Sequence, residues 1–220
     1  MHFTWKMEAR YLLRDSRAWD FLMGVREKRL ERAWGKCGRF GPPHIVKQQI
    51  VLEHAKAFRT NVLVETGTYL GDMVYAMRNK FKDIYSIELS PELHRRASEA
   101  FKKYPHIHLL AGNSATVLDV VLAHIEEPCL FWLDGHCSGG ITATADDWCP
   151  IRGEMEAIRR HRVKNHVILV DDANCFDGNH GYPTLFELHD IVLSSFVGYQ
   201  MQMFDNVIRI RPARMIGDFL

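Results

Sequence analysis

The sequence predicts a three-layer α/β sandwich, in which helices cover both faces of a seven-stranded, mostly parallel sheet that ends in an antiparallel hairpin. Three observations predict this fold. Short apolar segments alternate with amphipathic ones from residue 44 onward, which is typical of parallel strands and the helices that cover them. Polar residues follow nearly every apolar segment. Two segments of alternating polarity then close the chain, separated by only two residues.

The parallel part of the predicted sheet begins after the Gly-Pro-Pro sequence at residues 41–43, which breaks the chain. A helix over Ile45–Phe58 leads into a first strand at Val62–Val64. Further strands are expected at Ile84–Ile87, Ile107–Ala111, Cys129–Leu133 and Val167–Val170. Helices are expected from Gly71 to Phe81 and over Glu92–Tyr104, Ala115–Ile125, Ile151–His161 and Leu185–Phe196. Each strand is therefore followed by a helix, as a parallel sheet requires.

The end of the chain breaks this rhythm. Tyr199–Phe204 and Val207–Arg211 both alternate with a period of two, and only Asp205 and Asn206 separate them. A connection of two residues permits an antiparallel hairpin and no parallel crossover. The seventh strand is therefore expected to run against the others.

Length and composition bound the protein class. The chain has 220 residues, of which 47% are hydrophobic and 25% charged, and its formal net charge is +1. These are proportions of a folded protein, and they suit one domain, expected at residues 44–220, with an extension at residues 1–43. The small net charge gives no reason to expect nucleic acid or an anionic membrane as the main partner.

The extension is basic. Between Lys6 and Arg39 it has ten Lys or Arg residues and five Asp or Glu residues. Much of it can form a helix, with an apolar side expected at Trp19, Leu22, Met23 and Leu30. We favour a helical cap that packs on the domain, with a contact to RNA or phosphate as the alternative.

The cysteines are odd in number and scattered, without C-x-x-C pairs, so they do not indicate a disulfide framework. They are Cys37, Cys129, Cys137, Cys149 and Cys175. The amino terminus does not resemble a secretory signal, and no apolar stretch is long enough to span a bilayer. We therefore expect a soluble, cytoplasmic protein without a membrane partner, and leave open whether it forms a homo-oligomer.

Unusual polar residues follow the predicted strands. They are Glu65 and Gly67, Glu88, Asn113 and Ser114, Asp134 and His136, and Asp171, Asp172 and Asn174, after strands one to five in turn. Ligands of open α/β sheets bind outside the carboxyl ends of the strands. The sequence therefore predicts a ligand site at this edge.

The segment from Glu65 to Gly71 indicates how a ligand could be held. Glycines allow positive φ and close approach of the backbone, and amides at a helix start favour anionic groups. The segment is not G-x-G-x-x-G, because Tyr69 stands where a glycine would help to seat a pyrophosphate. Glu88, about twenty residues on, could accept both hydroxyls of a ribose. A structural turn, with Glu88 capping the next helix, is the alternative.

Together these features resemble the class I S-adenosylmethionine-dependent methyltransferases, which have a Rossmann-like fold, and the resemblance covers residues 44–212. It implies S-adenosylmethionine as cofactor. The residues implied to hold its methionine part are Gly67 and its neighbours, namely Glu65, Thr68, Tyr69 and Gly71. Glu88 would bind the ribose, Asn113 and Ser114 would lie beside the adenine, and Asp134 would complete the cofactor site.

Three of the carboxylates suggest a metal. Asp134, Asp171 and Asp172 leave neighbouring strands, and such carboxylates repel one another unless a cation neutralises them. Hard oxygen ligands suit Mg²⁺ or Mn²⁺, and the arrangement resembles the metal-dependent O-methyltransferases, with Asn174 as a further ligand. A helix cap at Asp171–Asp172 is one alternative, and zinc held by His136 and cysteines is another, although the spacing fits no usual zinc pattern.

The expected reaction is Mg²⁺-assisted O-methylation of a small polar molecule, such as a sugar or a hydroxylated metabolite. A divalent cation lowers the pKa of a hydroxyl, and Asp134 would hold that cation. His136 titrates near neutrality, so it is the expected general base, unless it is a loop histidine bonded to backbone. The small residues from Ser138 to Cys149 are expected to form a lid. An RNA methyltransferase and a dinucleotide-binding oxidoreductase or binding module are the rival functions.

Overall fold

The computed structural model describes residues 14, 16–37, 41–135 and 149–213. The described strands form one sheet. They are β1 (Val62–Thr66), β2 (Asp83–Glu88), β3 (Ile107–Ala111), β4 (Leu130–Leu133), β5 (Val167–Val170), β6 (Tyr199–Phe204) and β7 (Val207–Pro212). Their order is β3-β2-β1-β4-β5-β7-β6, in which β1 to β5 are parallel and β7 runs antiparallel to both neighbours. The predicted seven-stranded α/β sandwich with its closing hairpin is confirmed.

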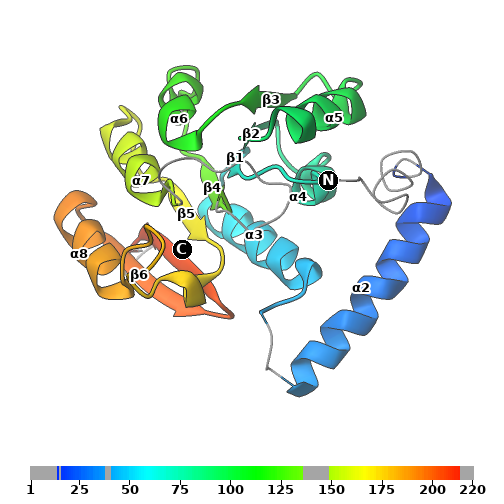
Figure 1. Cartoon of the computed structure of the whole chain (residues 1–220), viewed down its shortest axis with the longest axis horizontal. Coiled ribbons are helices and arrows are strands. Elements are labelled where there is room, and N and C mark those ends of the chain that lie inside the picture. The colour runs from blue at the N-terminus through cyan, green and yellow to red at the C-terminus, as the bar shows by residue number, and fades with distance from the viewer. Residues whose placement is uncertain (1–13, 15, 38–40, 136–148, 214–220) are drawn as a thin grey trace, which may run out of the picture.

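Helices cover both faces of this sheet (Figure 1). They are α3 (His44–Phe58), α4 (Asp72–Met77) and α5 (Pro91–Phe101) on one face, and α6 (Ser114–Leu122), α7 (Ile151–Arg160) and α8 (Leu185–Ser195) on the other. The strands alternate between the two cores, so that Trp132 of β4 packs with the first set and Phe131 with the second. Both faces of the central strands are buried, which explains their continuous apolar sequences.

The strand order reverses between β1 and β4. From β1 the chain builds β2 and β3 on one side, and then returns to place β4 and β5 on the other. The loops that leave β1 and β4 therefore diverge at neighbouring positions of the same sheet edge. Crevices at such reversal points are the usual ligand sites of open α/β sheets.

Three helices end three or four residues earlier than the sequence predicts. Helix α4 ends at Met77, α5 at Phe101 and α6 at Leu122, whereas the predicted ends are Phe81, Tyr104 and Ile125. Each helix is followed by a tight i to i+3 bond, such as the one from Tyr104 N to the Phe101 carbonyl at 2.8 Å. The apolar residues beyond the ends still pack into the core. The apolar pattern indicates which residues are buried. Because residues after the end of a helix can also be buried, the pattern does not predict where the helix ends.

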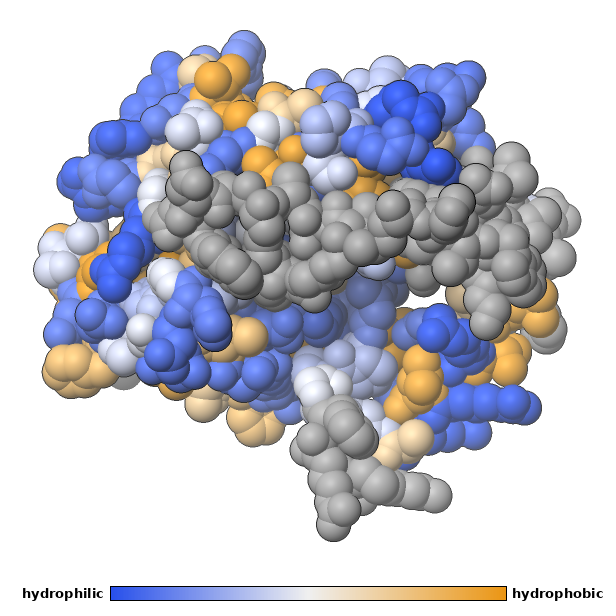
Figure 2. All heavy atoms as spheres, in the orientation of Figure 1, coloured by the Kyte–Doolittle hydropathy of each residue, from blue (hydrophilic) through white to orange (hydrophobic). Residues whose placement is uncertain are grey.

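The amino-terminal extension forms α2 (Arg17–Cys37), which contacts α3 and lies at the edge of the molecule in Figure 1. Glu27 accepts a hydrogen bond from the Ile45 amide at 3.2 Å, and Trp34 packs against the edge of the core. The predicted apolar side is wrong for Leu22 and Leu30, which are 59% and 40% exposed. Figure 2 shows orange and blue residues side by side along this helix. No described helix is long and apolar enough to cross a bilayer.

A buried histidine pair lies below β4 and β5, at the sheet edge opposite the predicted site. The Cys129 amide donates to His166 Nδ1 at 3.1 Å, His166 Nε2 and His161 Nδ1 are 2.9 Å apart, and His161 Nε2 lies 3.1 Å from the Ile125 carbonyl. With one proton on each Nε2, every ring nitrogen has its partner. A second proton on either ring would face a donor, so the fold requires both rings to be neutral.

We expect this pair to make the protein less stable in mild acid. Burial, followed by the charge of His161, lowers the pKa of His166 to about 4. The unfolded chain binds more protons between about pH 6.5 and pH 4, so stability falls as pH falls through that window, by up to about 3 kcal/mol. Urea unfolding at several pH values measures this loss. A His166→Gln variant should show a flatter dependence, and an equally steep one would contradict the assignment.

Candidate active site

The glycine turn after β1 lies against the loop after β4. Gly67 has a φ of +84°, Tyr69 of +48° and Gly71 of +70°. A Cβ atom at Gly67 would lie 2.3 Å from the carbonyl oxygen of Asp134, so the turn leaves no room for a side chain at this position. Position 67 therefore requires a glycine, as the sequence predicts. This position lies where the strand order reverses, between β1 and β4.

Glu88 connects the end of β2 to this turn. Its carboxylate accepts the Tyr69 amide at 2.7 Å through one oxygen and the Ser90 amide at 2.8 Å through the other, and it is 4% exposed. The hydroxyl of Ser90 accepts the Leu93 amide at 3.5 Å and caps α5. The cap that we weighed for Glu88 is therefore supplied by Ser90, and Glu88 faces the glycine turn.

A buried hydrogen-bond chain supports the turn from below. The Ser86 hydroxyl of β2 donates to the Glu65 carboxylate of β1, and it lies 2.6 Å from the Thr68 hydroxyl. Glu65 is 2% exposed, and burial raises its pKa well above the ordinary value, although the bond from Ser86 acts in the opposite direction. Glu65 and Thr68 therefore bond within the protein, through Ser86, which the sequence analysis did not single out.

Asn113 and Ser114 follow β3 at the same edge of the sheet. The Asn113 side chain accepts the Ala115 amide at 3.0 Å and caps α6, while Ser114 is buried in the first turn of that helix. In the β2–β3 register, Glu88 pairs with Ala111. Asn113 and Ser114 follow Ala111 by two and three residues, so they leave the sheet next to Glu88. Their contact with an adenine ring stays a prediction.

The carboxylate of Asp171, after β5, is compensated by a cation of the protein itself. Lys47 of α3 donates from its ammonium to Asp171, whose side chain is fully buried, and the Asp172 amide donates to the other oxygen at 2.9 Å. Burial raises the pKa of Asp171, and the Lys47 charge acts against that rise. Burial lowers the pKa of Lys47, but the charge and hydrogen bond of Asp171, together with the charges of Asp134 and Asp172, leave the ammonium pKa raised.

Asp172 binds the hairpin turn between β6 and β7. Its carboxylate accepts from the Asn206 side chain at 3.2 Å, and the Asn206 carbonyl and side-chain oxygens accept the amides of Ala173 and Asn174, each at 2.9 Å. Asp172 precedes the short helix η1 (Ala173–Cys175) but makes no side-chain cap bond to it. The antiparallel hairpin thus holds the loop that follows β5.

The described residues do not fit the predicted magnesium site. They contain no group of three or more His, Cys, Asp or Glu residues that could hold a metal ion. Asp171 is bonded to Lys47 and Asp172 to Asn206, so these two carboxylates already have partners within the protein. The Lys47 ammonium group balances the charge on Asp171, for which the sequence predicts a metal ion.

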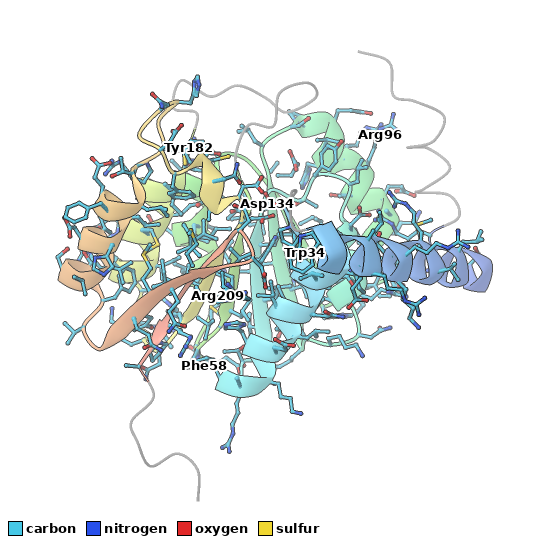
Figure 3. All side chains as sticks on the ribbon, turned by 90° about the horizontal axis from the view of Figure 1, so that it is seen from below. Trp34, Phe58, Arg96, Asp134, Tyr182 and Arg209 are labelled. Atoms are coloured by element: carbon cyan, nitrogen blue, oxygen red, sulfur yellow. The ribbon has the colours of Figure 1, made fainter. Side chains whose placement is uncertain are left out.

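A small, mostly apolar pocket lies between the ends of β4 and β5 and the start of α7. Its volume of about 10 Å³ corresponds to roughly one water molecule. Gly135, Asp171, Tyr182 and Glu154 line it together with apolar residues, and burial raises the pKa of the Tyr182 phenol. Figure 3 places Asp134 near the centre of the molecule, with Tyr182 toward the α8 side.

Sequence reasoning missed Glu154. It lies in the first turn of α7 and is 1% exposed, and its carboxylate would be 3.3 Å from a Cβ at Gly135. The available signal was its place one turn after Ile151 and next to Met155, on the buried side of α7. A carboxylate inside an apolar stripe at a ligand-binding edge is a candidate functional group.

Two of the sequence predictions lie outside the described residues: the base His136 and the lid, over most of Ser138–Cys149. Cys149 is described, is buried, and lines the small pocket. The zinc alternative includes His136 and Cys137, which the structure does not describe.

The comparisons with known proteins agree with this fold. No family model and no curated protein matches the chain. The solved structure of the methyltransferase PaMTH1 from Podospora anserina, bound to S-adenosylhomocysteine, is 18% identical with a TM-score of 0.53, and the match covers 97% of this chain and 98% of that one.

Two further structures are similar. The O-methyltransferase TomG of Streptomyces achromogenes, in complex with S-adenosylmethionine, is 11% identical with a TM-score of 0.55, and 85% of this chain and 89% of that one are covered. The N-methyltransferase NodS of Bradyrhizobium japonicum is 14% identical with a TM-score of 0.52, over 78% of this chain and 97% of that one. At these identities the likeness shows a Rossmann-like methyltransferase fold.

Proposed function

We propose that this protein is an S-adenosylmethionine-dependent methyltransferase that methylates a small polar acceptor on oxygen. One observation carries the proposal: Gly67 packs against the Asp134 carbonyl without room for a side chain, while Glu88 reaches the same turn through the Tyr69 amide. A glycine turn and an acidic strand end at the reversal point suit a nucleoside-containing ligand. The methyltransferase fold of the similar structures supports this choice over a dinucleotide.

The residues of the site fit this cofactor. The glycine turn would hold the methionine part, and the Glu88 carboxylate would bind the ribose hydroxyls. When bound, the cofactor supplies a methyl group on a positively charged sulfur. The acidic edge formed by Asp134, Asp171 and Asp172, whose charges all raise the pKa of Lys47, suits that positive charge.

Deprotonation of the acceptor completes the proposed chemistry. We keep His136 as the proposed base, because in the sequence it stands two residues after Asp134. We derive no step through Mg²⁺, since the described residues around Asp171 do not fit it. The remaining task of the protein is to align the acceptor oxygen with the methyl group and sulfur.

Calorimetric titration of the full chain with S-adenosylhomocysteine and, separately, with NAD tests the proposal. We expect S-adenosylhomocysteine to bind and NAD not to bind. A Glu88→Gln variant should weaken S-adenosylhomocysteine binding about tenfold or more, because its NH2 group is a donor and cannot accept hydrogen bonds as the second carboxylate oxygen does, from the Tyr69 or Ser90 amide and from the ribose. Preferential binding of NAD would replace this function by that of a dinucleotide-binding protein.

The acceptor can be sought once cofactor binding is established. Radiolabelled S-adenosylmethionine, incubated with the protein and fractionated cell extracts, should transfer label to small molecules and leave RNA unlabelled. Label in RNA that declines steeply with added salt would favour the rival function, in which the basic extension binds phosphate.

A further inference from the structure

Arg14, from the amino-terminal extension, is inserted beneath the glycine turn. Its guanidinium donates to the carbonyls of Leu70 and Gly71, the latter at 3.4 Å, and to the Asp72 carboxylate at 3.1 Å. The Arg14 side chain is almost fully buried, with 3% of the residue exposed. An arginine buried to this degree is unusual, and here its charge is balanced by Asp72.

Two aromatic rings enclose the same guanidinium. Its central carbon lies 5.3 Å from the ring centre of Tyr75 in α4 and 5.5 Å from that of Phe101 in α5. The Tyr75 hydroxyl also donates to the Arg14 carbonyl. Both the backbone and the side chain of Arg14 are thus bound to the helix that starts at the glycine turn.

The turn needs such support. Three of its five residues from Gly67 to Gly71 have positive φ, which is a costly conformation for Tyr69. A Cβ at Gly71 would lie 2.7 Å from the Phe101 ring and 3.2 Å from the Arg14 guanidinium, so these two side chains form the floor of the turn. The position opposes the helix dipole, since the amino-terminal end of α4 repels a cation. The Asp72 carboxylate and the carbonyls of Leu70 and Gly71 compensate for this repulsion.

We propose that Arg14 is a positioning residue for the cofactor: it fixes the glycine turn in the conformation that binds S-adenosylmethionine. This inference rests on the proposed function and deepens it, because it gives the amino-terminal extension a part in the cofactor site. Arg14 does not touch the ligand, and acts through the carbonyls of Leu70 and Gly71.

Arg78 offers a matched control. Its guanidinium lies 3.6 Å from the ring centre of Tyr75 and donates to the Tyr75 carbonyl at 2.5 Å, but no bond from it to the turn is found among the described residues. Arg78→Ala therefore removes a cation that contacts the same Tyr75 ring as Arg14 does. Arg14→Lys keeps the charge and loses the planar group that binds two carbonyls and a carboxylate together.

The experiment measures two properties of each full-length variant. Calorimetry gives the affinity for S-adenosylhomocysteine, and hydrogen–deuterium exchange of the ligand-free protein gives the protection of peptides that cover the turn and α4. We expect Arg14→Ala to lower the affinity about tenfold or more and to raise exchange in these peptides, with Arg14→Lys close to it. Arg78→Ala should leave both properties near those of the original chain.

The outcomes are distinguishable. If the original chain does not bind S-adenosylhomocysteine, the proposed function fails, and the exchange data still decide whether Arg14 orders the turn. If the original chain binds and Arg14→Ala binds equally well, the positioning role is overturned. A loss of thermal stability in Arg14→Ala with unchanged affinity and unchanged exchange in the turn would also overturn it, because that is the result of a purely structural contact.

Discussion

Replacing Gly67 with alanine is expected to abolish binding of S-adenosylhomocysteine, with an affinity at least a hundredfold lower. The new Cβ would lie 2.3 Å from the oxygen and 2.8 Å from the carbon of the Asp134 carbonyl. Both atoms belong to the backbone, so no side-chain rotation relieves the collision. The loops after β1 and β4 must separate, and the φ of +84° adds strain for any residue with a Cβ. We expect a loss of about 2 kcal/mol or more in unfolding free energy.

Gly24 in α2 gives the matched control for this change. A Cβ there would meet no atom within 4 Å, and its φ is not in the positive range. Gly24→Ala should leave the affinity unchanged and raise stability by about 0.5–1 kcal/mol, because alanine favours a helix interior. Calorimetry and chemical unfolding of the two variants give the comparison. Normal ligand binding by Gly67→Ala would show that the turn is not the cofactor site.

Much of the fold could be predicted because its cause is local. The strand at Val167–Val170 was placed at its observed bounds, and the two residues Asp205 and Asn206 were enough to predict the antiparallel hairpin. Apolar runs between helices leave few arrangements for a parallel sheet. Helix ends were placed less well, since Phe81 and Ile125 continue the apolar pattern after the helices α4 and α6 have ended.

The candidate site could be predicted in its position but not in its pairings. Strand ends share one edge in any parallel sheet, so Gly67, Glu88 and Asp171 could be grouped before the structure was known. Which cation meets which carboxylate depends on contacts between distant segments. Lys47 and Asp171 are 124 positions apart, and Arg14 and Gly71 are 57 apart.

One signal in the sequence could have indicated the missed partner of Asp171. Lys47 stands beside Val46, one turn before Ile50 and Val51, which all face the core. A lysine on the buried side of α3 requires a carboxylate close to its ammonium group, because a buried charge is costly without an opposite charge. Without that signal, the carboxylates appeared to require a metal ion.

Replacing Lys47 with methionine is expected to destabilise the protein by about 3–5 kcal/mol in unfolding free energy at neutral pH. The Asp171 side chain is fully buried, and loss of the ammonium leaves its charge with the hydrogen bond from the Asp172 amide. Breaking a buried ion pair from one side costs this much because the remaining charge stays in a poorly solvated place. Urea unfolding at pH 7 measures the loss.

The two halves of the pair should behave differently. Lys47 is 19% exposed at its side chain, so in Asp171→Asn its flexible chain can turn the ammonium toward water, and we expect a smaller loss. The double variant Lys47→Met with Asp171→Asn should be more stable than Lys47→Met alone. Equal losses in all three variants would show that the ion pair itself is not the cause.

The pH dependence of the unfolding free energy of Lys47→Met shows whether its loss of stability is caused by the unpaired Asp171 charge or by lost packing. Burial already raises the pKa of Asp171 in the original chain, and without Lys47 nothing of comparable strength opposes it. A carboxyl group whose folded pKa lies above its unfolded pKa favours the folded state at low pH and loses that contribution as pH rises through the folded value. The deficit of Lys47→Met should therefore shrink as pH falls toward the ordinary pKa of an aspartate, whereas a deficit caused by lost packing would stay constant.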